Sequence, residues 1–149
     1  VDEVIDSRNS HRDLTDLDPS DPPADVIAQH RFTFENYGVQ NGPGGLALLP
    51  VKHGWEVFEA IAWEDGNTLP PWVHRDVAQR WEERFGAELA VIDGAVIEFF
   101  VPEPISDRAV AIAVAREHIG YGDEDGSGLT LRDVASSLLV SSIWSFWWD

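Results

Sequence analysis

The last six residues of the chain include four aromatic side chains, in the order Trp144-Ser145-Phe146-Trp147-Trp148-Asp149. Aromatic side chains bury large apolar areas, and chain ends fray unless contacts hold them. We therefore expect this segment to dock, either into the core of the chain itself or onto a partner. As a strand it would place Phe146 and Trp148 on one face and Trp147 on the other. We expect Trp147 to pack in the core against helix 72–85 and Trp148 to be more exposed.

Periodicity along the chain predicts an α+β domain. Val73, Val77, Trp81 and Phe85 recur every four residues, which indicates a helix with an apolar stripe. The dipeptide Asp93-Gly94 is a two-residue hairpin signal between two strands. We predict a single domain, with a mixed or antiparallel sheet and about three helices packed on it. The predicted strands span 46–51, 56–63, 87–92, 95–101 and 143–148, and the predicted helices span 72–85, 106–119 and 130–140.

The predicted helices carry recognisable ends. Pro70-Pro71 is tolerated at the opening of the first helix, and Gly86 ends it as a left-handed cap. Ser106 is the expected N-cap of the second helix, with Asp107 in its first turn. Thr130 and Asp133 have the spacing of a capping box at the start of the third helix.

The net charge of −17 is the strongest compositional constraint. Residues 1–25 contain eight acids and two arginines, show no apolar periodicity, and end in a proline-rich stretch. Segments of this composition bury too little apolar surface to offset the entropy of ordering. We interpret residues 1–25 as an acidic, flexible N-terminal arm and residues 26–149 as a single α+β domain.

The acidic balance excludes some classes of partner. Proteins that bind nucleic acid directly present a basic face to the phosphates, and anionic membranes repel an acidic surface. The charge permits a solvated acidic surface, a basic protein partner or cation binding. Cysteine is absent, and Val1-Asp2-Glu3 lacks the layout of a secretion signal, so we expect a cytoplasmic protein that has no membrane contact.

The chain contains five short motifs, Gly54-Trp55, Trp63, Asn67-Thr68-Leu69-Pro70, Arg84-Phe85-Gly86-Ala87 and Phe146-Trp147-Trp148-Asp149. Together they resemble the bacterial domain-of-unknown-function family 4253, over about residues 46–149, and the most specific of them is the terminal Phe-Trp-Trp-Asp. Two features depart from the family: Gly120-Tyr121-Gly122-Asp123 stands where the family often has Tyr-x-Tyr-Cys-Pro-Asp, and the acidic arm has no counterpart. The resemblance implies a fold and a bacterial cytoplasmic setting, but no activity and no catalytic residues.

One acidic loop is similar to the first half of a calcium-binding EF-hand loop. Asp123, Asp125 and Ser127 supply oxygens at positions one, three and five, and a glycine follows at position six. Position twelve requires a bidentate glutamate, but Val134 stands there and Asp133 is one place early. The missing ligand favours an acidic surface turn, and a weak, water-completed calcium site is the alternative. No other cofactor is indicated.

The sequence contains no recognisable catalytic constellation. His53, His74 and His118 are too scattered for metal-ligand spacing, and we expect His74 and His118 at the surface or the edge of the core. Glu56 and Glu59 fall on opposite faces of the predicted strand 56–63, which argues against a catalytic pair of carboxylates.

We hypothesise a non-enzymatic interaction module that binds a basic protein partner. A toxin-neutralising immunity protein or a mimic of nucleic-acid charge would present its carboxylates in this way. The alternative is an enzyme or small-ligand binder with an aromatic, acid-lined pocket near Trp55, Trp63 and Asn67. Most tryptophans are expected in the core, and the remaining candidates for partner contact are Trp72, Trp148 and Asp149.

Overall fold

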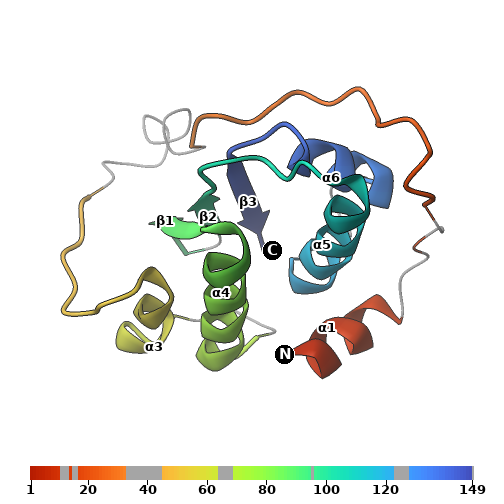
Figure 1. Cartoon of the computed structure of the whole chain (residues 1–149). Coiled ribbons are helices and arrows are strands. Elements are labelled where there is room, and N and C mark those ends of the chain that lie inside the picture. The colour runs from red at the N-terminus through yellow and green to blue at the C-terminus, as the bar shows by residue number, and fades with distance from the viewer. Residues whose placement is uncertain are drawn as a thin grey trace.

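The computed structural model describes residues 1–10, 14, 17–32, 45–63, 69–94, 96–122 and 128–148. Within these ranges it contains five α-helices and one antiparallel sheet of three strands, which confirms the predicted α+β class (Figure 1). None of the helices in these ranges is long and apolar enough to cross a membrane. The elements are α1 (Asp2–Asn9), the 3-10 turn η1 (Gly54–Glu56), α3 (Val57–Ala60), α4 (Pro71–Phe85), β1 (Glu88–Ile92), β2 (Val96–Phe100), α5 (Arg108–Tyr121), α6 (Leu131–Leu138) and β3 (Ile143–Trp147).

The strands lie in the order β1-β2-β3, and both neighbouring pairs are antiparallel. The β1–β2 hairpin turns at the predicted Asp93-Gly94. Residues paired across strands share a face of the sheet, so the β2–β3 register sorts the side chains into two sets. Ile97, Phe99, Trp144 and Phe146 form what we call the aromatic face, and the paired residues Glu98 and Ser145 lie on the opposite, polar face.

Helix α4 places the fully buried Trp81 over the aromatic face. The Trp81 ring stacks on Phe146, with ring centroids 5.2 Å apart and planes at 18°. It meets Phe99 and Trp144 edge-on at 5.5 and 5.6 Å, and Tyr121 of α5 at 5.3 Å. Such pairs add about 0.5–1.5 kcal/mol each beyond the area they bury. The aromatic C-terminal segment therefore docks into the chain's own core.

The predicted ends of α4 are confirmed. Pro71 occupies the first turn, where a missing N–H costs little. Gly86 follows the last helical residue with a φ of 66°, a left-handed conformation that glycine adopts without strain. Its N–H donates to the Glu82 carbonyl oxygen at 2.9 Å, which satisfies one carbonyl of the last turn.

The third predicted helix start is confirmed, and the second is displaced by one residue. Thr130 and Asp133 form the predicted capping box of α6. The N-cap of α5 is Asp107 and not Ser106, because the extended backbone of Asp107 lets its carboxylate accept the Val110 N–H at 2.9 Å. Serine and aspartate are both good N-caps, so composition alone does not separate adjacent candidates.

Two predicted strands are wrong. Residues 46–50 form no strand, and Leu46 and Leu48 are more than nine-tenths exposed. Residues 54–60 form η1 and α3 in place of a strand. The Glu56 carboxylate accepts the N–H groups of Lys52 and His53 at 2.6 and 3.0 Å, and this capping starts a helical turn.

The N-terminal residues, predicted as an arm without regular structure, include the helix α1. Ile5 is buried against α5, and the Asn9 side-chain amide donates to the Arg116 carbonyl oxygen at 3.0 Å. A Cβ placed on Gly120 of α5 would lie 2.6 Å from the Ile5 Cγ2 atom. The sequence did not predict this helix. Its one buried side chain, Ile5, packs against Gly120, which is far along the chain, and a single buried residue leaves no periodic pattern.

The exposure of the terminal tryptophans is the reverse of the prediction. Trp148 is 2% exposed and Trp147 is 53% exposed. Trp147 pairs with Val96 on the polar face, whereas Phe146 takes the position against Trp81 that was predicted for Trp147. Alternation correctly grouped Phe146 with Trp148, but it could not tell which of the two faces would be covered.

Candidate functional site

Two of the predicted contact residues, Trp63 and Trp148, lie together. Their ring centroids are 5.7 Å apart in a T-shaped arrangement. Trp72 is 44% exposed at the start of α4. Two further predicted contact residues, Asn67 and Asp149, lie outside the described part of the chain.

A fully buried histidine, His74 of α4, packs against both tryptophans. Its ring centroid is 4.8 Å from that of Trp63 and 5.7 Å from that of Trp148. Its Nδ1 is 2.8 Å from the Tyr121 hydroxyl and its Nε2 is 3.3 Å from the Leu69 carbonyl oxygen. A carbonyl only accepts, so Nε2 carries the proton and Nδ1 accepts from the tyrosine. The expectation that His74 lies at the surface or core edge is wrong.

This arrangement fixes what the cluster does within the described structure. Both imidazole nitrogens of His74 are used inside the protein, and aromatic rings enclose it. The ring therefore acts as a polar link that lets α4 and α5 bury a tyrosine hydroxyl without loss of its hydrogen bond. Its contacts are those of a core histidine.

His118 of α5 is a second buried histidine, again against expectation. Its ring lies 4.7 Å from both Trp81 and Trp144. Burial lowers the pKa of His118 from 6.5 to about 3, because a protonated ring at this position would carry its charge out of contact with water. Its Nε2 atom is buried and has no hydrogen-bond partner among the residues that the structure describes. At neutral pH His118 is therefore an uncharged part of the aromatic core.

The remaining predicted aromatic residue, Trp55, lies in η1, which contacts α4. Its ring stacks on His53 at 5.1 Å and 9°. The His53 Nδ1 atom lies 3.2 Å from the Glu82 carboxylate, which links η1 to α4. Backbone N–H donors, first from His53 and then from Lys52, lower the pKa of Glu56. These contacts use the local carboxylates to hold the turn together.

The sequence argued against a catalytic pair of Glu56 and Glu59, and offered a weak calcium site in the acidic loop only as an alternative. Glu56 caps a helical turn, while Glu59 forms an ion pair with Arg75 at 2.7 Å, so the two serve separate structural roles. The calcium candidates Asp123, Asp125 and Ser127 lie outside the described residues. Among the residues that are described, no group of three or more metal-ligating side chains gathers in one place.

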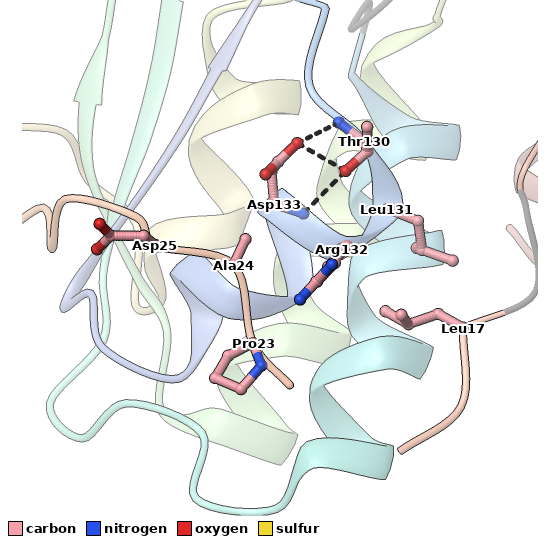
Figure 2. Close-up of a pocket in the computed structure, with 8 residues that line it drawn as sticks. All are labelled: Leu17, Pro23, Ala24, Asp25, Thr130, Leu131, Arg132 and Asp133. Carbon is pink, nitrogen blue, oxygen red and sulfur yellow. Dashed lines mark hydrogen bonds between the residues drawn. The ribbon is translucent and has the colours of Figure 1, made fainter. Parts of the chain in front are cut away.

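A groove of about 550 Å³ lies between the N-terminal segment and the start of α6 (Figure 2). At one end Thr130 and Asp133 face each other, and the Thr130 hydroxyl and N–H donate to the Asp133 carboxylate at 2.6 and 2.8 Å. These bonds lower the pKa of Asp133 and place a negative charge at the helix start. An anionic ligand is therefore disfavoured there. The lining residues are Leu17, Pro23, Ala24, Asp25, Thr130, Leu131, Arg132 and Asp133.

The arginines of α4 are used in intramolecular ion pairs. Arg75 binds Glu59 and Asp76, Arg80 binds Asp2 of α1, and Arg84 binds Glu117 of α5 at 2.6 Å. The hydrogen bond from Arg80 lowers the pKa of Asp2. The positive charges of α4 are thus paired with carboxylates of the same chain.

The acids of the N-terminal segment remain at the surface. Asp18, Asp21 and Asp25 are exposed, and no ion pair among the described residues involves them. Hydrogen bonds from Ser20 lower the pKa of Asp18, so this carboxylate stays charged under mildly acidic conditions. We call these three residues the acidic edge. One of them, Asp25, lines the groove, and its carboxylate points away from α6 (Figure 2).

The sequence did not predict a buried polar cluster of Glu98, Ser145 and Gln29. Glu98 of β2 is fully buried and accepts the Ser145 hydroxyl at 2.7 Å, and the Gln29 side chain donates to the same Ser145 oxygen at 2.7 Å. One signal was present in the sequence, since a glutamate inside the apolar run of β2 marks a strand face with a polar neighbour. The partner Gln29 lies 116 residues from Ser145, so only the fold reveals the contact.

Fold and surface together define a small α+β domain with a three-stranded antiparallel sheet, an aromatic core and an acidic N-terminal segment. The sequence model of a family described as a domain of unknown function, DUF4253, matches residues 45–149, and the chain belongs to this family. The matched region begins after α1 and the acidic edge. No curated protein and no solved structure matches the chain.

Proposed function

We propose that the protein is a non-enzymatic interaction module that binds a basic partner protein. The single observation that supports this most is the sorting of its charges. Arg75, Arg80 and Arg84 are paired within the fold, whereas the acidic edge is exposed and has no cation among the described residues. The net charge of −17 adds a long-range field that would steer a positively charged partner.

The acidic edge has further properties of a contact surface. The Asp18 backbone N–H donates to the Asp21 carboxylate at 3.1 Å, and the Ser20 hydroxyl donates to Asp18 at 2.7 Å. The carboxylates of Asp18 and Asp21 are thus held in one turn, which lowers the entropy lost on binding. The groove next to them adds the apolar side chains of Leu17 and Leu131. A basic segment that also carries an apolar side chain would match this combination. An immunity protein or a mimic of nucleic-acid charge is a function of this class.

The test is salt-dependent binding with charge-matched variants. The full chain is immobilised, basic proteins are captured from a lysate, and their affinity is measured between about 0.05 and 0.5 M salt, across which the screening length falls several-fold. The variant D18N/D21N/D25N removes the acidic edge. The control E83Q/E88Q/E103Q removes the same number of exposed charges elsewhere.

We expect the acidic-edge variant to lose about tenfold or more in affinity and the control to lose much less, because only the edge would contact the partner directly. Capture that is indifferent to salt would contradict the proposal. Equal losses in both variants would show that the total charge, and not this edge, attracts basic proteins.

A further inference from the structure

Residues 22–30, which we call the strap, run across α6 to the start of β3 (Figure 1). They bury little apolar surface, and Ile27 is 96% exposed. A segment held by hydrophobic contact would hide this side chain. The strap must therefore be held by other forces.

Hydrogen bonds join the strap backbone to α6 and to the start of β3. The Ala24 N–H donates to the Ser136 hydroxyl and the Gln29 N–H to the Ser141 hydroxyl, both at 2.8 Å. The Gln29 carbonyl accepts the N–H groups of Ser142 and Ile143 at 3.0 and 3.2 Å. Arg132 Nε donates to the Pro22 carbonyl oxygen at 2.9 Å. None of these five bonds depends on a strap side chain.

The serine hydroxyls are oriented to accept. The Ser136 hydroxyl donates its own hydrogen to the Arg132 carbonyl oxygen at 2.6 Å, and the Ser145 hydroxyl donates to Glu98 at 2.7 Å. Each oxygen therefore presents lone pairs toward the strap, at a position set by the domain and not by the strap. Ser145 uses this capacity to accept the Gln29 carboxamide at 2.7 Å. Ser136 and Ser141 are almost fully buried beneath the strap.

We infer that Ser136, Ser141, Ser142 and Ser145 form a docking site, the serine track, for the main chain of an extended peptide with a carboxamide side chain at the Gln29 position. In this chain the strap occupies the track as an intramolecular ligand. The track lies inside the region matched by the family, whereas the strap lies before it. Backbone recognition beside a sheet edge is a general way for proteins to bind extended segments of partners. This inference does not depend on the charge of the partner.

The first test uses a synthetic peptide of residues 20–32 and a full-length variant in which the strap is released. The substitutions A24P and Q29P remove the two N–H groups that bind the serine hydroxyls and leave the track unchanged. The control I27P places proline at an exposed position of the same segment. Fluorescence anisotropy of the labelled peptide gives the affinity for each protein.

We expect the released variant to bind the peptide about tenfold or more tightly than the wild type or I27P, because a tethered strap competes at a high effective concentration. Adding S136A/S141A to the released variant should remove most of this binding. N-methylation of the peptide backbone at position 29 should weaken binding strongly, and N-methylation at position 27 should not. Equal affinity of all proteins, or binding that survives both serine substitutions, would overturn the inference.

Amide hydrogen exchange in the unmodified chain tests the same site without any substitution. The amides of Ala24 and Gln29 should exchange at least about tenfold more slowly than that of Ile27, because only the first two are hydrogen-bonded to the track. This measurement remains decisive if the proline variant does not fold. Similar exchange at all three positions would show that the strap is not held, and would overturn the inference.

Discussion

The aromatic face of the sheet and the strap are held by different kinds of contact. On the aromatic face, Trp81 is fully buried and touches the rings of Phe99, Trp144 and Phe146. The strap attaches through hydrogen bonds from its backbone to serine hydroxyls, and its Ile27 is left in solvent. Helix α1 is held by apolar contact, since Ile5 is buried and Val1 and Val4 pack partly against the core.

This difference separates the aromatic core, which stabilises the fold, from the strap, which is attached to its surface. Burial of large rings depends on many contacts at once, so the aromatic face forms or melts as a unit. A hydrogen bond to the strap replaces one that water would offer, and its net contribution is only about 0.5–1.5 kcal/mol. The strap is therefore suited to reversible attachment, and the core is not. Four predictions test this contrast, in order of decreasing effect.

The largest effect is expected from Trp81→Ala. The substitution removes a fully buried indole that contacts five rings and donates to Glu117 at 2.9 Å. Truncation of such a side chain costs about 3–5 kcal/mol, enough to unfold a marginal domain. Urea unfolding followed by circular dichroism measures the loss. The matched control is Trp72→Ala, which should cost about 1 kcal/mol or less because Trp72 is 44% exposed.

A pair of neighbours, Phe146→Ala and Trp147→Ala, tests which side of β3 is buried. Phe146 stacks on Trp81 and should cost about 3–4 kcal/mol of unfolding free energy when truncated. Trp147 is 53% exposed and should cost about 1 kcal/mol or less although it is the larger residue. The reverse order of the two losses would mean that the β2–β3 register is shifted by one residue.

The third prediction concerns pH. The pKa of His118 is about 3 in the folded protein against 6.5 for an ordinary histidine. Between these values the unfolded chain takes up a proton that the folded protein does not, so stability falls as pH falls from 6.5 to 3 and levels off below. This group alone removes about 2–3 kcal/mol between pH 6.5 and 4.5.

Unfolding curves at several pH values, compared with those of His118→Phe, isolate this contribution. Phenylalanine keeps the ring among Trp81 and Trp144 and cannot be protonated. Since the His118 Nε2 atom has no hydrogen-bond partner, its loss leaves no partner unsatisfied. Parallel dependence of stability on pH in the two proteins would show that His118 is not buried as described.

The smallest effect is expected from Gly120→Ala beneath α1. Alanine in place of glycine inside a helix usually stabilises by about 1 kcal/mol. Here the new Cβ would lie 2.6 Å from Ile5 Cγ2 and 3.0 Å from the Ile5 carbonyl oxygen. We expect a net loss of about 1–2 kcal/mol and faster amide exchange confined to α1.

The double variant Ile5→Ala/Gly120→Ala provides the control for this clash. Removing the Ile5 side chain makes room for the new methyl group, so the double variant should be less destabilised than the sum of the two single changes. Strict additivity would mean that α1 does not contact Gly120.

Local signals predicted the elements whose causes lie within a few neighbouring residues. The apolar stripe and Gly86 define α4, Asp93-Gly94 defines the hairpin, and the Thr130–Asp133 spacing defines the start of α6. Residues 54–60 were misread because Glu56 caps a turn by folding back on Lys52 and His53, a contact that composition does not reveal.

The candidate sites were predictable only in part. Trp63, predicted in an aromatic pocket, and Trp148, predicted as a candidate for partner contact, lie together, and the rings of both pack against the buried His74. The serine track was not predicted, because serines that are spread over α6 and β3 become a site only when Gln29 lies across them.

By itself the sequence determined that the C-terminal aromatics must dock, that helix 72–85 carries an apolar stripe, and that acids outnumber bases. These properties follow from the apolar area, the periodicity and the charge of the residues. The tertiary structure decided that Phe146 and Trp148 are buried and Trp147 is exposed. Both sides of β3 carry aromatic rings, so alternation alone is symmetric. Pairing with β2 and contact with Trp81 break that symmetry.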